Sequence, residues 1–159
     1  HVTVKRSGRT IYEDNALNDA VVTKGAVARV IQMSISVDDQ EAMEFDGDGI
    51  VLSTPTGTTA YSMSAGGPIV EPGAENIIVT PICAHSMSIR SLVLSRERTV
   101  ATRIGRIGKR SAFLSVDGGK AFRLSAEDEV IVTASNRSIQ LIRLKDTSFY
   151  GVLNHKFQG

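Results

Sequence analysis

The sequence predicts a mainly β domain built as a two-sheet β-sandwich, and three features of the chain support this prediction. Residues 31–37 alternate apolar and polar side chains, which is the period of two of a strand with one buried face. Further short apolar runs are separated by Asp-Gly, Pro-Gly and Asn-Arg-Ser turn signals. The segment SAFLSVDGGKAFRLS (111–125) places Asp117 and Gly118 between two alternating runs, which indicates a β-hairpin. This spacing favours a sandwich over βαβ units.

The expected strands follow one another along most of the chain. The first residues already look like a strand, and residues 31–37 form the next clear one. After these, strands are predicted for IVLSTP (50–55), NIIVTPIC (76–83), SLVLS (91–95), both arms of the hairpin, EVIVTAS (129–135) and SIQLIRL (138–144).

Two segments favour helix. Residues 58–65 begin with hydroxyl side chains that can cap a helix and end before Gly-Gly-Pro, which predicts a short helix of about two turns. In the tail DTSFYGVLNHKFQG (146–159), apolar side chains recur at roughly helical spacing: Phe149, Tyr150, Val152, Leu153 and Phe157. This much apolar surface predicts that the tail docks on something.

Composition narrows the class of protein. The 159 residues, 42% of them hydrophobic, are enough for one well-buried domain. The 18 basic and 17 acidic residues nearly cancel and are scattered, which argues against a nucleic-acid partner. No apolar run approaches the roughly 18 residues of a membrane span. Cys83 stands alone and cannot form an internal disulfide, so we expect a soluble cytoplasmic protein with no membrane partner. Because the chain lacks an initiator Met, we expect a fragment of a longer protein.

Common catalytic and metal-binding motifs are missing from the sequence. The three histidines lie far apart without HxxxH or HExxH spacing, and one cysteine gives no zinc site. No GxSxG motif supports a serine hydrolase, and neither a Walker A loop nor GxGxxG occurs.

The most informative segment is FDGDGIVLSTPTGTTAYSMSAGG (45–67). Asp46 and Asp48 precede an apolar strand in a Gly-rich turn, where their carboxylates can accept hydrogen bonds from ribose hydroxyls or serve only as turn formers. The short helix that follows presents amide groups with partial positive charge, and Tyr61 offers a face on which a flat base can stack. Hydroxyl groups surround it: Thr56, Thr58, Thr59 and Ser64. The segment suits a nucleotide, although a capped helical turn packed on the sandwich explains the same composition.

Two further polar sites can be interpreted as turn or capping residues, and the first of them also as ligand-binding residues. Asn18 and Asp19, in ALNDAVV, form a pair of the kind that usually caps or turns the chain, but Asn can also recognise an adenine edge and Asp a ribose. Asp117 is interpreted as a turn residue.

Taken together, these motifs resemble the C-terminal domain of the NAD kinase family, whose members phosphorylate the 2′-hydroxyl of the adenosine ribose of NAD. The likeness runs from ALNDAVV through DGIVLSTPTGTTAYSMSAGGPIV and TPICAHSMSIRSLVL to VDGG and FYGVL. It implies the C-terminal domain of a two-domain kinase, with residues 1–145 forming the NAD-binding sandwich. Residues 146–159 are then expected to pack on an absent N-terminal α/β domain.

The resemblance also implies roles for individual residues. Asn18 and Asp19 match the family's Asn-acidic pair, which holds the adenine and a ribose, and Asp48 matches an aspartate near the nicotinamide end. Residues 59–64 match the segment that wraps the adenosine, with Tyr61 lining the base and Ser64 close to the ribose. The implied NAD-binding set is Asn18, Asp19, Arg29, Asp46, Asp48, Thr56, Thr59, Ala60, Tyr61, Ser64 and Cys83. Arg29 and Cys83 are expected to act across a subunit interface.

The chain departs from the family pattern at several positions. Thr58 stands where Ser is usual, Asp46 where many relatives have Arg, and Gly119 where Gln is common. The family's GGDGT motif, which supplies the catalytic aspartate and a phosphate cradle, does not occur. We therefore assign no catalytic or metal-binding residue here, and expect residues 1–159 alone to bind NAD weakly at most and to show no kinase turnover.

The family resemblance implies partners as well. The full enzyme would use ATP or inorganic polyphosphate as phosphoryl donor, with Mg²⁺ or another divalent cation, and would form a homodimer or homotetramer. The alternative is a non-catalytic nucleotide-binding or assembly domain. A carbohydrate-binding sandwich is disfavoured because the chain has no Trp to supply aromatic platforms.

Overall fold

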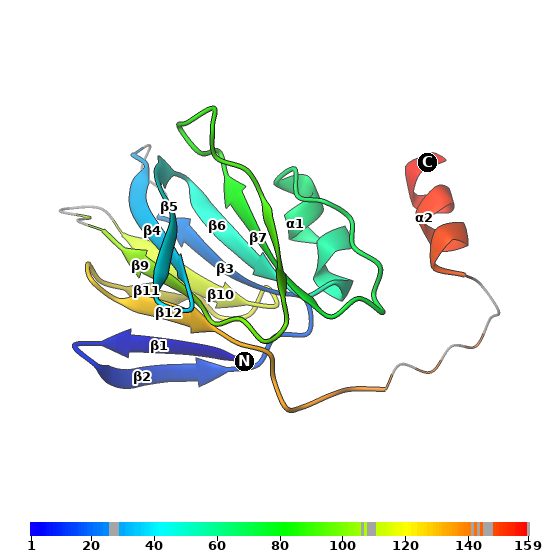
Figure 1. Cartoon of the computed structure of the whole chain (residues 1–159), viewed down its shortest axis with the longest axis horizontal. Helices are drawn as coiled ribbons and strands as arrows, with labels where there is room; N and C mark the ends of the chain where they lie inside the picture. The colour runs from blue at the N-terminus through cyan, green and yellow to red at the C-terminus, as the bar shows by residue number, and fades with distance from the viewer. Residues whose placement is uncertain are drawn as a thin grey trace.

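Two β-sheets pack face to face, with a short helical segment beside them and another helix near the C-terminus (Figure 1). The computed structural model describes residues 1–25, 29–105, 107, 111–140, 142, 144 and 148–158. Within these residues, twelve strands pair in antiparallel fashion and divide into two sheets of six. The mainly β, two-sheet architecture predicted from the sequence is confirmed. No helix in the described part of the chain is long and apolar enough to cross a membrane.

Both sheets combine strands that are distant in the sequence. The first sheet has the order β2-β1-β12-β9-β4-β5, formed by Arg9–Asp14, Val2–Arg6, Glu129–Val132, Val100–Ile104, Ile31–Val37 and Gln40–Gly47. The second has the order β11-β10-β3-β6-β7-β8, formed by Phe122–Leu124, Ala112–Val116, Asp19–Lys24, Gly49–Ser53, Asn76–Ile82 and Leu92–Ser95. The predicted hairpin is present, since β10 pairs with β11.

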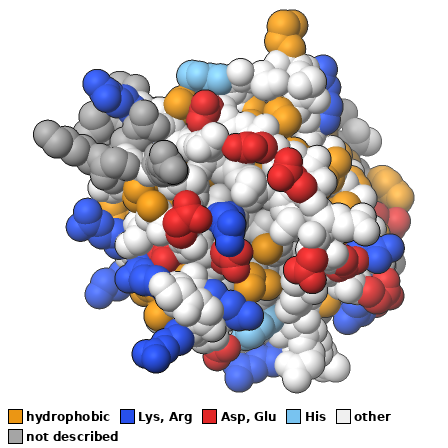
Figure 2. Space-filling model, turned by 60° about the vertical axis from the view of Figure 1, so that its left-hand side comes forward, with side chains coloured by type: hydrophobic (Ala, Val, Ile, Leu, Met, Phe, Trp, Pro, Cys, Tyr) orange, Lys and Arg blue, Asp and Glu red, His pale blue; other side chains and the backbone are white. Residues whose placement is uncertain are grey.

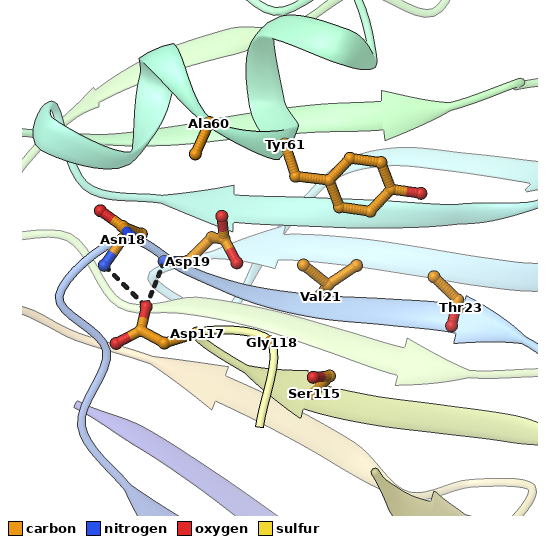
Figure 3. Close-up of a pocket in the computed structure, with 9 residues that line it drawn as sticks. All are labelled: Asn18, Asp19, Val21, Thr23, Ala60, Tyr61, Ser115, Asp117 and Gly118. Carbon is orange, nitrogen blue, oxygen red and sulfur yellow. Dashed lines mark hydrogen bonds between the residues drawn. The ribbon is translucent and has the colours of Figure 1, made fainter. Parts of the chain in front are cut away.

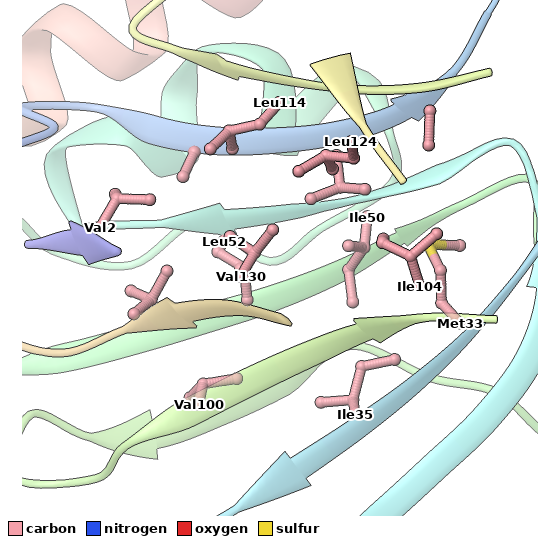
Figure 4. Packing of buried hydrophobic residues seen from close by; sticks show 14 of the residues in the cluster. Val2, Met33, Ile35, Ile50, Leu52, Val100, Ile104, Leu114, Leu124 and Val130 are labelled. Carbon is pink, nitrogen blue, oxygen red and sulfur yellow. The ribbon is translucent and has the colours of Figure 1, made fainter. Parts of the chain in front are cut away.

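The main core lies between the two sheets (Figure 4). In β4, Ile31, Met33 and Ile35 are fully buried while Gln32 is exposed, which confirms the predicted alternation. Opposite them, the second sheet contributes its own inward side chains, among them Ile50, Leu52 and Leu114. Burial of each such side chain stabilises the fold by about 1.5–3 kcal/mol relative to exposure.

Strand β6 is buried on both faces, which explains why its apolar run does not alternate. All five of its residues are buried. Its inward side chains join the main core, while Val51 joins Val21 and Ile82 in a smaller cluster on the outer face. Ala65, at the end of the short helical segment, packs against this cluster. The helical segment is therefore held on the outer face of the second sheet.

That helical segment is broken rather than continuous. The prediction of one helix over 58–65 is only partly right, because a 3₁₀ turn, η1 (Thr56–Thr59), is followed by a separate helical turn, α1 (Tyr61–Ser64). Between them, Ala60 has φ −101° and ψ −127°, which is outside the helical region.

The C-terminal helix α2 (Phe149–Gln158) confirms the helical spacing of the tail, and none of its residues is buried. Figure 1 shows it set apart from both sheets. Lys156 links it to the sandwich by donating a 2.8 Å hydrogen bond to the carbonyl of Thr59. The expected domain boundary at 145–146 lies outside the described residues.

The strand predicted over 138–144 is wrong for the residues that can be judged. Residues 138–140, 142 and 144 are not in a strand, and 141 and 143 lie outside the described residues. The physical reason is that β12 already pairs with β1 and β9 on its two sides, so the chain that follows it finds no free edge beside it. The apolar side chains of this segment that the structure describes, Ile139, Ile142 and Leu144, are exposed.

Charged side chains are mixed on the face shown in Figure 2, where acidic and basic groups lie next to one another. Ion pairs among the described residues include Arg103 with Glu129 at 3.2 Å and Arg98 with Asp38 at 2.7 Å. On the part of this face that the structure describes, acidic side chains interrupt the basic ones, unlike the continuous basic stripe that follows a nucleic-acid backbone.

Candidate functional site

A pocket of about 390 Å³ lies on the outer face of the second sheet. We refer to it as the sheet-face pocket. It opens between the helical segment and the β10–β11 turn (Figure 3). Its lining residues are Asn18, Asp19, Val21, Thr23, Ala60, Tyr61, Ser115, Asp117 and Gly118. Four members of the predicted NAD-binding set are therefore brought together here: Asn18, Asp19, Ala60 and Tyr61.

Strand β3 forms the floor of the pocket because its side chains alternate between the two faces of the sheet. Ala20 and Val22 point into the main core, so Asp19, Val21 and Thr23 point outward into the pocket. The floor is thus apolar in its middle and polar at both ends.

Tyr61 supplies one side of the pocket. It is the first residue of α1 and is 44% exposed, which is high for a large aromatic side chain. In Figure 3 its ring extends along β3, above Val21 and toward Thr23. A flat heteroaromatic ring can stack in this position without displacing any protein group.

Asp19 is the buried acid of the pocket. The residue is only 6% exposed, and no donor among the described residues reaches its carboxylate, which faces the pocket in Figure 3. Burial raises the pKa of Asp19 above its ordinary value, and the nearby charge of Asp117 raises it further. A buried carboxylate without a donor is unfavourable for the folded protein. Its free lone pairs are available to a ligand hydroxyl.

Asp117 fixes the turn that carries Asn18 and Asp19. Its carboxylate accepts hydrogen bonds from the backbone N–H groups of Leu17 (2.7 Å), Asn18 (2.7 Å) and Asp19 (3.0 Å). Its own N–H donates to the carbonyl of Asp19 at 2.9 Å. Asp117 is a turn residue as expected, with φ 48° followed by Gly118 at φ 69°, but it also lines the pocket, which the sequence did not indicate.

The TPTG sequence holds the same turn from the other side. Thr54 donates its backbone N–H to the carbonyl of Asn18 (2.9 Å) and its hydroxyl to the carbonyl of Leu17 (2.7 Å). The Gly57 N–H then bonds to the Thr54 hydroxyl at 3.1 Å. A side chain at Gly57 would collide with the backbone of Asn18, so glycine is required at this close approach.

The four hydroxyl residues singled out around Tyr61 in the sequence lie outside the sheet-face pocket. Thr56 lines a second cavity of about 610 Å³ at one end of the sandwich. Ser64 is exposed on α1, and the hydroxyl of Thr59 bonds only to the carbonyl of Thr56, at 3.4 Å. Thr58 is fully buried; its hydroxyl donates to Pro55 and accepts from the N–H of Val70. Thr58 is therefore a structural residue of this turn.

The remaining predicted residues are also not among those lining the pocket. Asp48 forms a 2.7 Å ion pair with Lys24, at the far end of β3 from Asp19. Asp46 is exposed on β5 in the other sheet. Arg29 is exposed beyond β3, and Cys83 is exposed just after β7 with φ 47°. Gly119 donates its N–H to the carbonyl of Val116, which closes the hairpin turn.

No group of three or more His, Cys, Asp or Glu side chains in the described ranges is arranged to hold a metal ion. The second cavity is lined by His1, Asn76 and Arg96 among others, and its described lining includes no cluster of acidic side chains. The described residues therefore do not fit a metal site.

The fold and the pocket together define a β-sandwich domain with a small-molecule-sized pocket on an outer sheet face. The volume lies in the range of small-molecule sites, and an apolar floor, an aromatic side and a few converging polar groups are typical of them.

Comparison with known proteins gives the family. Residues 17–144 match the family model of the ATP-NAD kinase C-terminal domain, and the chain belongs to this family. The NAD kinase of Carboxydothermus hydrogenoformans is 39% identical over 155 residues, which cover 98% of this chain and 55% of that protein. The chain thus spans about half the length of the curated relatives it matches.

Solved structures agree with this assignment. A yeast NADH kinase complexed with NADH has a TM-score of 0.76 at 35% identity, covering 83% of this chain and 38% of that chain. An NAD kinase from Archaeoglobus fulgidus in complex with ATP has a TM-score of 0.68 at 28% identity, covering 84% of this chain and 49% of that one.

Proposed function

We propose that this chain is the NAD-binding domain of an NAD kinase, an enzyme that transfers a phosphoryl group to the 2′-hydroxyl of the adenosine ribose of NAD. The observation that carries the proposal is the sheet-face pocket. It places the buried carboxylate of Asp19, which no donor among the described residues reaches, beside an exposed aromatic ring, Tyr61, in a member of the ATP-NAD kinase C-terminal domain family.

Each half of an adenosine has a partner in this pocket. The adenine stacks on Tyr61, and the Asn18 amide offers a donor and an acceptor to the edge of the base. The Asp19 carboxylate accepts hydrogen bonds from ribose hydroxyls, which are strong because the acceptor is charged. Ala60 leaves room for the ligand, since its side chain is small. Thr59 and Ser64, which the family resemblance adds to this set, lie on the helical segment next to Ala60 and Tyr61 but outside the pocket lining.

The nicotinamide half extends toward Asp48 along β3. This strand has six residues, from Asp19 to Lys24, and so spans roughly 17 Å at a rise of about 3.3 Å per residue. That length matches the scale of a dinucleotide. Asp48 must then exchange its ion pair with Lys24 for a contact with the ligand. Thr56 lines the second cavity rather than this path, so this placement of NAD gives its side chain no contact with the ligand.

ATP or inorganic polyphosphate supplies the phosphoryl group in this proposal. Support for ATP comes from the A. fulgidus NAD kinase, whose structure is a complex with ATP. Phosphoryl transfer requires a positioned donor and neutralisation of its charge, for which Mg²⁺ or another divalent cation is the usual agent. Because the described residues form no metal cluster, the ligands of the cation come from elsewhere. We assign no catalytic residue to this chain.

We place the enzyme in the cytoplasm as a homodimer or homotetramer. Arg29, Asp46 and Cys83 are exposed and lie outside the pocket lining, which suits contacts made to a ligand held by a neighbouring subunit. Residues 146–159 pack on an N-terminal α/β domain. The exposed apolar side chains of α2 support this, namely Tyr150, Val152 and Phe157.

A coupled assay for NADP tests the proposal. Purified protein extended to the length of its relatives is incubated with NAD, Mg²⁺ and either ATP or polyphosphate, and NADP is detected with an NADP-specific dehydrogenase. We expect NADP from the extended protein and none from residues 1–159. NAD binding without NADP formation by the extended protein would favour the non-catalytic nucleotide-binding alternative. NADP formation by residues 1–159 alone would show that the catalytic groups are already in this chain.

A further inference from the structure

The carboxylate of Asp117 makes an unusual set of contacts for a hairpin-turn residue. Turn aspartates commonly bond to backbone groups two residues further along the chain. The carboxylate of Asp117 instead binds three consecutive N–H groups that are 98 to 100 residues away in the sequence. All three belong to residues 17–19, the turn that enters β3 at the rim of the sheet-face pocket.

We propose that Asp117 is a positioning residue of the NAD site, which holds residues 17–19 so that the side chains of Asn18 and Asp19 face the ligand. This role rests on the proposed function and adds to it a residue that does not need to touch the base. Three hydrogen bonds to one charged acceptor fix the backbone of the turn more firmly than neutral contacts would. Thr54 holds the opposite side of the same turn through Leu17.

The register of the second sheet makes this contact possible. Strand β10 pairs directly with β3, with Val116 opposite Ala20, so the turn that follows β10 lies beside the residues that precede β3. In Figure 3 the Asp117 carboxylate lies below Asn18 and Asp19, on the side of the turn away from the helical segment. A shift of the hairpin would therefore move both ligand-facing side chains together.

Asp117 also acts on Asp19 through its charge. The titratable groups that line the pocket with Asp19 are Asp117, from the β10–β11 turn, and Tyr61, from α1. Burial raises the pKa of Asp19, and the Asp117 charge raises it further. Since ionised Asp19 is the better acceptor for ribose hydroxyls, NAD affinity falls when the pH drops through this pKa. Neutralising Asp117 lowers the pKa of Asp19 and moves that fall to lower pH.

The test compares Asp117→Asn with a matched control, Asp38→Asn. Both substitutions are made in protein extended to the length of its relatives. Asp38 is also an exposed turn aspartate with a positive φ, 49°, and its carboxylate accepts the Thr99 N–H at 2.9 Å, but it lies in the other sheet. Asn tolerates this backbone conformation and keeps one acceptor oxygen. Its NH₂ group replaces the other oxygen and cannot accept a hydrogen bond from a backbone N–H. NAD dissociation constants are measured by titration calorimetry from pH 4.5 to 8.

The proposal predicts that Asp117→Asn weakens NAD binding roughly tenfold or more, as expected for lost hydrogen bonds to a charged group. It also predicts that the acidic midpoint, the pH at which NAD affinity has fallen halfway as Asp19 is protonated, moves to lower pH. Asp38→Asn leaves both unchanged. Equal affinities and equal midpoints for the two variants would overturn the role of Asp117 while leaving the proposed function intact. Failure of the unsubstituted protein to bind NAD would instead refute the proposed function.

A second variant decides the matter if Asp117→Asn does not fold. Thr54→Val removes the hydroxyl that donates to the Leu17 carbonyl and accepts the Gly57 N–H, and it leaves Asp117 in place. If the position of the turn controls NAD affinity, Thr54→Val weakens binding several-fold, and hydrogen exchange at residues 17–19 becomes faster than in the Asp38→Asn protein. Unchanged affinity together with unchanged exchange would overturn the proposal.

Discussion

Replacing Gly57 with alanine should damage the fold and the site together. The new Cβ would lie 2.8 Å from the Cα and 2.5 Å from the carbonyl carbon of Asn18, and closer still to its oxygen. Carbon atoms in ordinary contact are about 3.5–4.0 Å apart, so the two backbones must separate by roughly 1 Å. Both are backbone atoms, which leaves no flexible side chain to absorb the movement.

The free-energy cost follows from these contacts. Overpacking of this kind costs about 1–3 kcal/mol, and separation also threatens two hydrogen bonds, from the N–H of Thr54 to Asn18 and from the N–H of Gly57 to Thr54. At about 1 kcal/mol each, these bring the expected loss to about 3–5 kcal/mol. NAD affinity should fall as well, because the turn carrying Asn18 moves.

Urea unfolding and NAD titration measure the two effects. Gly73→Ala is the matched control, since a Cβ at Gly73 meets nothing within 4 Å, and its unfolding free energy should change by less than about 0.5 kcal/mol. The reasoning is refuted if Gly57→Ala unfolds at the same urea concentration as Gly73→Ala and binds NAD equally well.

Substitutions at three further positions test separate parts of the structure. Asp19→Asn should weaken NAD binding yet raise the free energy of unfolding at pH 7: the folded-state pKa of Asp19 is raised, so its charge destabilises the fold above that pKa. A fall in both quantities would argue against this. Tyr61→Ala should weaken NAD binding by about 1–3 kcal/mol while Tyr61→Phe retains most of it, because stacking needs only the ring; unfolding curves check that both variants fold. Asp128→Asn should lower the unfolding free energy by about 1–3 kcal/mol at pH 7, since Asp128 is fully buried and bonds to Arg6 through two 2.8 Å contacts. Burial alone would raise the pKa of Asp128, but the Arg6 guanidinium and the Ser125 N–H lower it overall. The stabilisation is therefore present at neutral pH and lost as the pH falls below about 4, where the variant and the unsubstituted protein should converge.

Much of the fold could be predicted because its signals are local. The alternation in β4 and the Asp-Gly turn of the hairpin each reflect the geometry of a few neighbouring residues. The failed strand at 138–144 shows the limit of such signals. Its apolar pattern is less regular than that of β4, because Leu141 and Ile142 are adjacent. A strand also needs a free partner, and both sides of β12 are already occupied.

The pocket shows the same division between local and distant information. Asn18, Asp19, Ala60 and Tyr61 belong to two short motifs, and the structure brings them together. The role of Asp117 could not be seen in VDGG, because it depends on β10 pairing with β3 almost 100 residues away.

A crystal structure of the protein with NAD is the most direct test of the central claim, that the sheet-face pocket binds the adenosine half of NAD. We predict electron density for the adenine stacked on Tyr61 and a ribose hydroxyl within hydrogen-bonding distance of the Asp19 carboxylate. Adenosine density in the cavity at the end of the sandwich, with neither residue in contact, would contradict the claim.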